Sequence, residues 1–263
     1  MELELYQIDA FTNKVFSGNP AAVVPLDKWL EDQLLQKIAA ENNLAETAFF
    51  VSHDDGYQIR WFTPLAEVDL CGHATLASAH VLFEELGCGS SELLFYSKSG
   101  QLQVSKINDQ NNDLIALDFP TQKPVECDVP QGLEDALGID ISLCLKNEIY
   151  IVVLADEDEV VKLSPNFTKL LNLGIRGVAV TALSSNYDFI NRYFAPLIGI
   201  NEDSVTGSAY TKLIPYWSQK LNKKHMIAKQ VSDRGGEVFC ELVDDRVKIA
   251  GTAVKYLSGK IYI

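Results

Sequence analysis

The sequence has few basic residues and no long apolar run. Lys and Arg together number 22 against 36 Asp and Glu, which gives a formal net charge of -14 at pH 7. A surface with this charge repels phosphate backbones and anionic lipid, so we expect neither a nucleic-acid nor a membrane partner. No apolar run approaches transmembrane length, and the N-terminal residues show no basic segment followed by an apolar core. These absences predict a soluble, cytoplasmic protein.

Cysteine is scarce and has no recognisable spacing. The five cysteines are odd in number and scattered, and no C-x-x-C is present. Neither a disulfide framework nor a zinc ribbon fits this pattern, so reduced thiols are expected. The sequence also lacks G-x-G-x-x-G, a Walker motif and a lysine in a pyridoxal-phosphate context. We therefore expect no cofactor.

The remaining pattern is of many short strands with few helices. With 47% hydrophobic residues, the 263-residue chain can bury one large core or two medium ones. Helices are predicted from Asp27 as N-cap to about residue 42, over 73–86 and over 207–220. Short strands fill most of the rest, which favours an α+β fold. The best linker is 120–132, with three prolines and a glycine, and it predicts lobes 1–120 and 121–263, the last strand packing back on the first lobe.

One segment occurs twice, once on each side of this linker. Residues 60–74 read RWFTPLAEVDLCGHA, and residues 192–209 read RYFAPLIGINEDSVTGSA. After a small insertion, the CGHA of the first copy aligns with the TGSA of the second, and each then opens a helical stretch. This similarity indicates an internal duplication of a strand–turn–helix unit.

Each copy places a glycine, Gly72 or Gly207, at the N-terminus of a helix, which is called the helix mouth below. Free backbone N–H groups and the helix dipole make such a mouth favourable for an anion. Two mouths facing each other across a cleft would hold the carboxylate or enolate of a small anionic substrate. The alternative is that both copies make only the same core-packing turn. The neighbouring side chains are suited to proton handling, and they are Cys71, His73, Asp203, Thr206 and Ser208.

Glu46 is a further candidate, in the stretch NNLAETAFF at 42–50. A carboxylate held against apolar neighbours has a raised pKa, which suits a general acid/base. The alternative is a strand-end glutamate that faces water. A thiol–imidazole nucleophile formed by Cys71 and His73 is a third hypothesis. Residues two apart at a helix start generally point in different directions, so we expect no productive pair.

Four stretches together resemble one known family. They are DAFTNKVFSGNPAAVV, NNLAETAFF, RWFTPLAEVDLCGHATLASAHVLF and EDSVTGSAY, and they are similar to motifs of the PhzF family of phenazine biosynthesis-like proteins. That family shares the fold of diaminopimelate epimerase. The resemblance covers both halves and implies two pseudo-symmetric lobes, each a β-sheet wrapped around a central helix, with the active site between them. Ser204 departs from the family pattern, which often has Pro there.

The resemblance also implies roles for individual residues. Glu46 matches the acid/base that moves a proton between carbons, while His73, Asp203 and Ser208 match residues that bind or polarise the substrate and help relay the proton. A cofactor-independent isomerase acting on a small carboxylate-bearing substrate is implied, as is a homodimer. A binding or interaction protein that keeps only the fold is the alternative. The other residues implied to contact substrate are Cys71, Gly72, Thr206 and Gly207.

Two chemistries are disfavoured, the first by the resemblance and the second by residue spacing. Epimerases of this fold use one cysteine from each helix mouth, and Cys71 occupies the first such position. Thr206 holds the second, and a hydroxyl is far too weak an acid to replace a thiolate. Two-thiol racemisation is therefore not expected. No second and third ligand accompany His73 at usable spacing, so no metal site is predicted.

Overall fold

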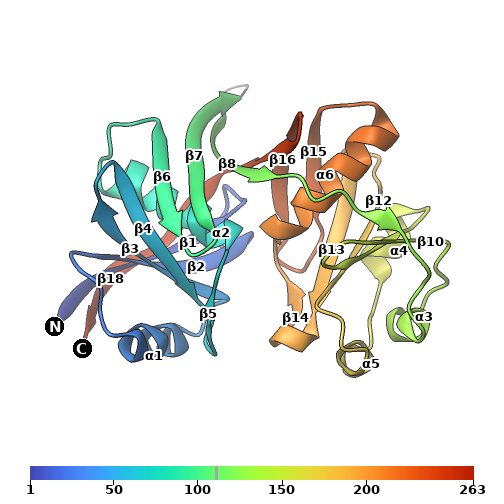
Figure 1. Ribbon diagram of the computed structural model, residues 1–263, viewed down its shortest axis with the longest axis horizontal. Coiled ribbons are helices and arrows are strands. Elements are labelled where there is room, and N and C mark those ends of the chain that lie inside the picture. Colours follow the sequence, from blue (N-terminus) through green and yellow to red (C-terminus); the bar gives the residue numbers. More distant parts are fainter. Residues whose placement is uncertain (110–111) are drawn as a thin grey trace. The chain divides into compact units, whose positions relative to one another are not determined.

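The computed structural model describes residues 1–109 and 112–263, and the chain separates into two compact units. Unit 1 comprises Met1–Phe119 and Lys248–Ile263, and unit 2 comprises Pro120–Val247 (Figure 1). The boundary predicted from the sequence lies one residue later and assigns 121–263 to the second lobe, with the last strand packing back on the first. In the structure, the segment that belongs to unit 1 begins at Lys248. Among the described residues, no helix has both the length and the apolarity needed to cross a membrane.

Unit 1 is a curved sheet around a helix. Strand β1 pairs antiparallel with β18 on one side and β2 on the other, and β2 runs parallel to β3. The order continues through antiparallel β4, parallel β6 and antiparallel β7 and β8. The bounds are β1 (Glu2–Ala10), β2 (Asn19–Leu26), β3 (Glu46–His53), β4 (Gly56–Phe62), β5 (Glu67–Val68), β6 (Glu92–Ser97), β7 (Gly100–Asp109), β8 (Asn112–Pro120) and β18 (Ala253–Tyr262).

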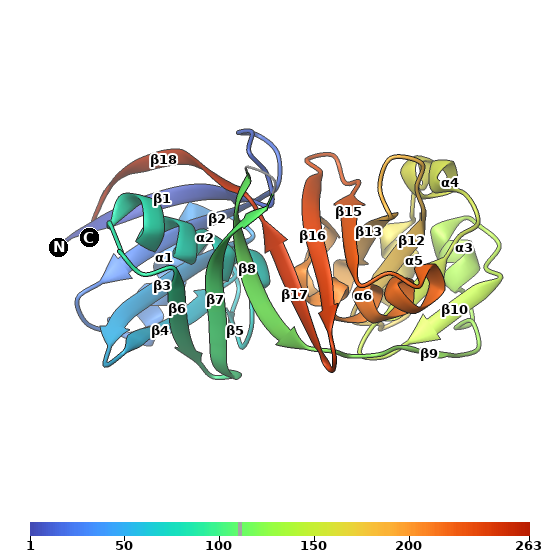
Figure 2. The ribbon, with the colours of Figure 1, turned by 90° about the horizontal axis from the view of Figure 1, so that it is seen from above.

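Helix α2 (Gly72–His80) is enclosed by these strands, and a π-helical turn, η1 (Val81–Glu85), extends it (Figures 1 and 2). It contacts β1, β2, β3 and β18. Residues 73–79 are all buried. A helix buried on every side needs small residues where strands approach closely, and the alanines at 74, 77 and 79 meet that need. The helix predicted over 73–86 is confirmed.

Helix α1 (Asp32–Asn42) packs on the outer face of the same sheet. Its buried residues Leu35 and Ile38 join a cluster with Phe49 and Phe62 of β3 and β4. The prediction that Asp27 caps this helix is wrong, because the helix begins at Asp32 and Glu31 is its N-cap residue. The spacing of apolar residues does not distinguish the first turn of a helix from a non-helical turn just before it. The first residue of a predicted helix is therefore easily misplaced.

Unit 2 repeats the connectivity of unit 1. Strand β11 runs parallel to β12, which pairs antiparallel with β13; β13 runs parallel to β15, which pairs antiparallel with β16. The same sequence of parallel and antiparallel pairings links β2, β3, β4, β6 and β7. The bounds are β9 (Val125–Glu126), β10 (Leu143–Lys146), β11 (Tyr150–Val153), β12 (Val178–Leu183), β13 (Phe189–Ala195), β14 (Ile200–Asp203), β15 (His225–Gln230), β16 (Gly236–Val243) and β17 (Arg246–Gly251), whose last residues belong to unit 1.

Helix α6 (Gly207–Leu221) is the counterpart of α2. It carries Pro215 inside its span, and proline has no N–H to donate to the carbonyl four residues earlier. That carbonyl belongs to Thr211, and the N–H of Gln122 donates to it at 2.9 Å. The linker that follows β8 therefore supplies the hydrogen bond that Pro215 cannot make. The apolar cluster on the other face of the sheet is covered by α3 (Leu133–Leu137), α4 (Glu157–Lys162) and α5 (Phe167–Asn172).

These two units confirm the α+β fold with two similar halves, each built around a central helix. The duplicated sequence corresponds to duplicated structure: Arg60 lies on β4 and Arg192 on β13, and the two glycine mouths start α2 and α6. The short 3-10 turn η2 (Pro196–Ile198) follows β13 directly, and its Pro196 and Leu197 align with Pro64 and Leu65 of the first copy.

Candidate active site

Three of the predicted residues meet in unit 1. Glu46 Oε2 lies 3.1 Å from His73 Nε2, and the two side chains are 12% and 6% exposed. Cys71 Sγ lies 3.5 Å from His73 Nδ1. The expectation that Cys71 and His73 point in different directions is therefore wrong. Cys71 is the extended N-cap residue of α2, with ψ at 110°, and this backbone turns its side chain toward the imidazole.

The local fold explains why these side chains meet. Strands β2 and β3 are parallel, with Ala21 opposite Glu46, so both strands begin at the same edge of the sheet. The mouth of α2 opens at this edge, because Glu46 and His73 are in contact there. The alternative that Glu46 faces water is excluded for the same reason.

Asn19, which is not among the residues predicted from the sequence, completes this cluster. Its Nδ2 lies 3.2 Å from His73 Nδ1, and the residue is 1% exposed. The preceding Gly18 has a φ of +66°, and a Cβ there would lie 2.2 Å from the carbonyl oxygen of Ala10. Only glycine fits such a position. The signal was present in the SGNP stretch, where a glycine directly precedes a polar residue at a strand start.

Electrostatics decide which of these groups carry protons. Burial acts to lower the pKa of His73, but neighbouring Cys71 and Glu46 oppose it, and the pKa lies well above its usual value. Burial and the charge of Glu46 raise the pKa of the Cys71 thiol. Because Cys71 is then a thiol at neutral pH, Glu46 is the charge that favours a proton on His73. The arrangement is a carboxylate–imidazole pair, with a protonated thiol at the opposite edge of the imidazole ring.

The Glu46–His73 contact leaves two polar atoms without hydrogen bonds. Glu46 Oε2 and His73 Nε2 are both fully buried and have no hydrogen-bond partner in the part of the chain that the structure describes. They lie 3.1 Å apart but are not aligned for a hydrogen bond with each other. Buried polar atoms are seldom left in this state, and a functional role is a common reason for it.

One ion could not use all three side chains. Potential ligand atoms of Glu46, Cys71 and His73 lie within 4.8 Å of one another. However, the thiol approaches Nδ1 and the carboxylate approaches Nε2, on opposite sides of the imidazole ring. A metal ion binds through one ring nitrogen, so the other ligand would face away from it. The geometry fits a path for protons better than a metal site.

The second set of predicted residues lies at the mouth of α6 in unit 2. Thr206 is the N-cap residue, and its hydroxyl donates to Asp203 Oδ2 at 2.6 Å. Gln230 Oε1 accepts from the Thr206 N–H at 2.9 Å, and its Nε2 donates to the carbonyl of Asp203 at 2.7 Å. Gln230 is fully buried and anchors this mouth. Its position, far along the chain in β15, gave no signal in the sequence.

The two glycines and Ser208 have simpler surroundings. Gly72 and Gly207 are the first helical residues of α2 and α6. Ser208 is exposed, and its hydroxyl makes no hydrogen bond within the described part of the chain, although its carbonyl accepts from Thr211 at 2.8 Å. Within each unit, then, the structure gathers the predicted residues at one helix mouth. The prediction that all of them act on one substrate stays a prediction.

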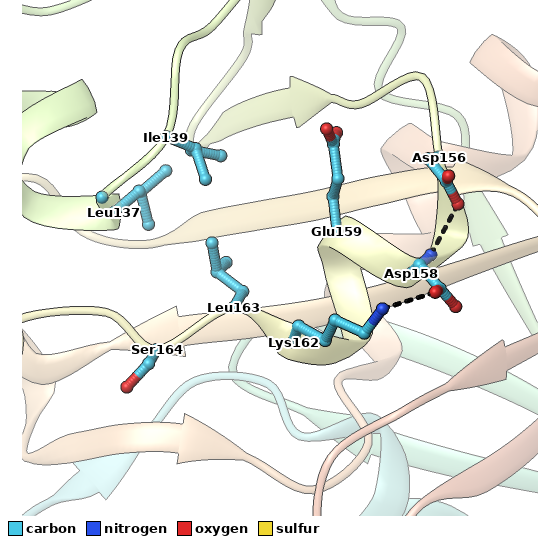
Figure 3. A pocket seen from close by; sticks show the side chains of 9 residues that line it. Leu137, Ile139, Asp156, Asp158, Glu159, Lys162, Leu163 and Ser164 are labelled. Carbon is cyan, nitrogen blue, oxygen red and sulfur yellow. Dashed lines mark hydrogen bonds and ion pairs between the residues drawn. The ribbon is translucent and has the colours of Figure 1, made fainter.

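A hollow elsewhere in unit 2 contains none of these residues (Figure 3). It has a volume of about 510 Å³ and lies between α3 and α4. Two of its three carboxylates are engaged: Asp156 accepts from the N–H of Asp158 at 2.8 Å, and Asp158 pairs with Lys162 at 2.6 Å. These two interactions stabilise the short helix α4.

Comparisons with known proteins bear on the family and the fold. The model of the phenazine biosynthesis-like protein family PhzC-PhzF matches residues 8–259. A protein of Pseudomonas aeruginosa that is named an uncharacterized isomerase is 50% identical over 263 residues, 100% of each chain. The crystal structure of a PhzF family protein from Enterococcus faecalis superimposes with a TM-score of 0.96 at 45% identity and covers 100% of both chains. A predicted epimerase from Pseudomonas aeruginosa, 18% identical with a TM-score of 0.81 over 99% of each chain, shares the fold.

Proposed function

The chain belongs to the PhzF family of phenazine biosynthesis-like proteins, and we propose from this that it is an isomerase that needs no cofactor. It moves a proton between two carbons of a small substrate that bears a carboxylate. Glu46 is the general acid/base. The observation that carries this proposal is the buried contact between Glu46 and His73, whose facing atoms have no hydrogen-bond partner in the described part of the chain.

The steps balance without any other reactant. The Glu46 carboxylate takes a proton from one carbon of the substrate, and the electron pair left behind delocalises into the adjacent unsaturated system. Protonated Glu46 then returns the proton to a different carbon, and the double bond shifts. A positioned acid/base group of this kind typically accelerates such a step by about 10²–10⁴-fold.

His73 and the mouth of α2 stabilise the intermediate. A ring that carries a proton at Nε2 donates toward the charge that forms beside Glu46, and the backbone N–H groups that follow Gly72 add the positive end of the helix dipole. In a buried site these groups act at low dielectric, so their effect exceeds what they would have in water. The proposal extends to Asp203 and Ser208, which would polarise or position the same substrate.

The thiol hypothesis is weaker, even though Cys71 contacts His73. A nucleophilic cysteine needs a lowered pKa, whereas burial and Glu46 raise the pKa of this thiol. Conversion of Cys71 to Ala is therefore expected to leave isomerisation within a few-fold of the parent. A protein that only binds its ligand is the remaining alternative, and the inward orientation of Glu46 speaks against it.

Deuterium uptake tests the proposal directly. The protein and its Glu46→Gln variant are incubated in heavy water with small unsaturated and hydroxylated carboxylic acids, and mass spectrometry counts deuterium gained at carbon. We expect uptake with the parent and a loss of at least about 10²-fold with the variant. Glu41→Gln, the same change at an exposed residue of α1, serves as the matched control. Equal uptake by Glu46→Gln, with unchanged thermal unfolding, would sink the assignment of the base.

Asp203 and Ser208 are tested in the same assay. Asp203→Asn and Ser208→Ala are expected to reduce uptake, because each removes a group proposed to touch the substrate. If both variants exchange deuterium as fast as the parent, the substrate is handled by the residues of unit 1 alone.

A further inference from the structure

We propose that Asn19 is a positioning residue that selects the tautomer of His73. In the neutral ring, the single proton is then on Nε2, facing Glu46, and Nδ1 is an acceptor. The catalytic consequence rests on the proposed function above, whereas the tautomer itself does not.

The contact that carries this inference is short and closed to water. Asn19 Nδ2 lies 3.2 Å from His73 Nδ1, and the two residues are 1% and 5% exposed. An amide NH₂ group can only donate, so a neutral imidazole that faces it must present the lone pair of Nδ1. Neutral imidazole carries one proton, and that proton must then be on Nε2.

The other groups around the ring act in the same direction. Cys71 Sγ lies 3.5 Å from the same Nδ1, and its raised pKa keeps it a thiol, which is a second donor to that nitrogen. On the opposite edge, Glu46 Oε2 lies 3.1 Å from Nε2, and although the two atoms are not aligned for a hydrogen bond, the negative charge of the carboxylate favours a proton on the nitrogen that it faces. Donors at Nδ1 and the negative charge facing Nε2 both favour the Nε2–H tautomer.

Backbone geometry holds Asn19 in this position. Gly18, in the left-handed conformation, turns the chain directly before it, and β2 begins at Asn19 itself. Asn19 pairs with Ala10 in the antiparallel ladder between β1 and β2. A side chain fixed at the end of a ladder has little freedom, so it can hold the imidazole in one orientation as well as in one tautomer.

The tautomer sets the polarity of the Glu46 contact whenever His73 is neutral; the imidazolium that its raised pKa favours carries a proton on both nitrogens. With the proton on Nε2, His73 donates toward the charge that forms during proton transfer, and it cannot take Glu46's place as base at that edge. With the proton on Nδ1, the lone pair of Nε2 would face the carboxylate, and the ring would repel the developing negative charge. A wrong tautomer of a catalytic histidine typically costs several orders of magnitude in rate, as the Ser-His-Asp enzymes show.

Nitrogen NMR of the full-length protein tests the tautomer without any substrate. Protein with ¹⁵N-labelled histidine is titrated to high pH, and two-bond ¹H–¹⁵N correlations show which nitrogen of neutral His73 carries the proton. The His73→Gln variant identifies its signals among those of the four histidines. We expect the Nε2–H pattern. An Nδ1–H pattern in the parent, as an Asn19 carbonyl facing the ring would produce, overturns the proposal.

The Asn19→Asp variant provides a second test of the tautomer. The near-isosteric carboxylate accepts at Nδ1, so the neutral ring is expected to change to Nδ1–H, with a fall in deuterium uptake of at least about tenfold. Asn147→Asp in unit 2 is the matched control, because Asn147 also donates through Nδ2, to the carbonyl of Lys123 at 3.1 Å. An Asn19→Asp variant that keeps the Nε2–H pattern contradicts the proposal.

The two proposals fail separately. If no acid exchanges deuterium with the parent protein, the isomerase proposal loses its support, while the NMR pattern still decides the role of Asn19. If the parent shows Nδ1–H but exchanges deuterium through Glu46, the proposed function stands and the role of Asn19 does not.

Discussion

Arg60 and Glu67 are joined by two parallel hydrogen bonds, with Nε 2.8 Å from Oε1 and Nη2 2.9 Å from Oε2. In unit 2, Arg192 and Glu202 repeat this pair at 2.7 and 2.8 Å. Each guanidinium also lies over the phenylalanine two residues later, at 5.1 and 5.0 Å. The duplication therefore preserved a structural brace between β4 and β5 in unit 1 and between β13 and β14 in unit 2, as well as the helix mouths.

The brace in unit 1 predicts a loss of stability in acid. Hydrogen bonds from Arg60 lower the pKa of Glu67 from 4.5 to about 2. A carboxyl group whose folded pKa is below its unfolded pKa stabilises the fold fully above the unfolded value and loses that effect as pH falls through the folded value. The free energy of unfolding of the parent should thus exceed that of Glu67→Gln above pH 4.5, and the difference should vanish near pH 2. A difference that is constant over this range would contradict the pairing.

Gly18 is predicted to tolerate no side chain. Its φ is +66°, and a Cβ would lie 2.2 Å from the Ala10 carbonyl oxygen and 2.6 Å from Thr12 Cγ2. Gly18→Ala should lower the free energy of unfolding by about 2–4 kcal/mol, the sum of backbone strain and a steric clash. Chemical denaturation measures this. Gly89→Ala is the control, because a Cβ at Gly89 meets nothing within 4 Å, and its cost should stay within about 1 kcal/mol.

Cys127 and Cys144 are predicted to form a disulfide when a disulfide oxidant is supplied. Their sulfur atoms lie 3.7 Å apart, and the N–H of Cys127 donates to the carbonyl of Cys144 at 3.0 Å. Burial raises the pKa of Cys144 to about 12, so attack should start from the more exposed Cys127. With oxidised glutathione, the protein should lose two hydrogens, and two molecules of reduced glutathione should form.

Mass spectrometry of digested protein identifies this crosslink. Cys127→Ser should leave Cys144 unmodified, because a buried thiol with a raised pKa reacts slowly. A parent protein that keeps a stable mixed disulfide with glutathione on Cys127 would show that the two sulfurs cannot close.

Lys212 is predicted to stabilise unit 2 through the linker. It is 2% exposed, and its Nζ donates to Gln122 Oε1 and to the carbonyl of Ser208 at 3.2 Å. Lys212→Met keeps the aliphatic bulk but leaves these acceptors without their donor, which should cost about 1–3 kcal/mol in unfolding free energy. Lys220→Met, at an exposed position of the same helix, should change it by less than about 0.5 kcal/mol. Equal effects of the two changes would show that the buried lysine is not needed.

Sequence patterns were sufficient for the duplicated architecture and for the helix mouths. They were insufficient for contacts made by side chains far apart in the chain. The pairing acids Glu67 and Glu202 follow their arginines by 7 and 10 residues, so an insertion hides their equivalence. Gln230 is brought to its helix mouth by strand pairing, which no local pattern indicates. Asn19 has a local signal in SGNP, but its contact with His73 also depends on the pairing of β1 with β2.

The prediction of the direction of the Cys71 side chain was wrong for another reason. The general rule for residues two apart applies inside a helix, but Cys71 is the N-cap residue and has extended backbone angles, with φ at -144°. A cap residue belongs to the chain that enters the helix, so its side chain can point back over the first turn. Rules of helical spacing should therefore not be carried across a cap.

The pairing of β1 with β18, which joins Glu2 to Tyr262, has a consequence for biosynthesis. As the ribosome adds residues in order, every strand of unit 2 up to β16 is made before β18 exists, so unit 2 can fold while β1 still has an unpaired edge. Such an edge is a template for unwanted strand association until its partner arrives. The half that is translated first is thus the half that is completed last, because its sheet cannot close until β18 has been made.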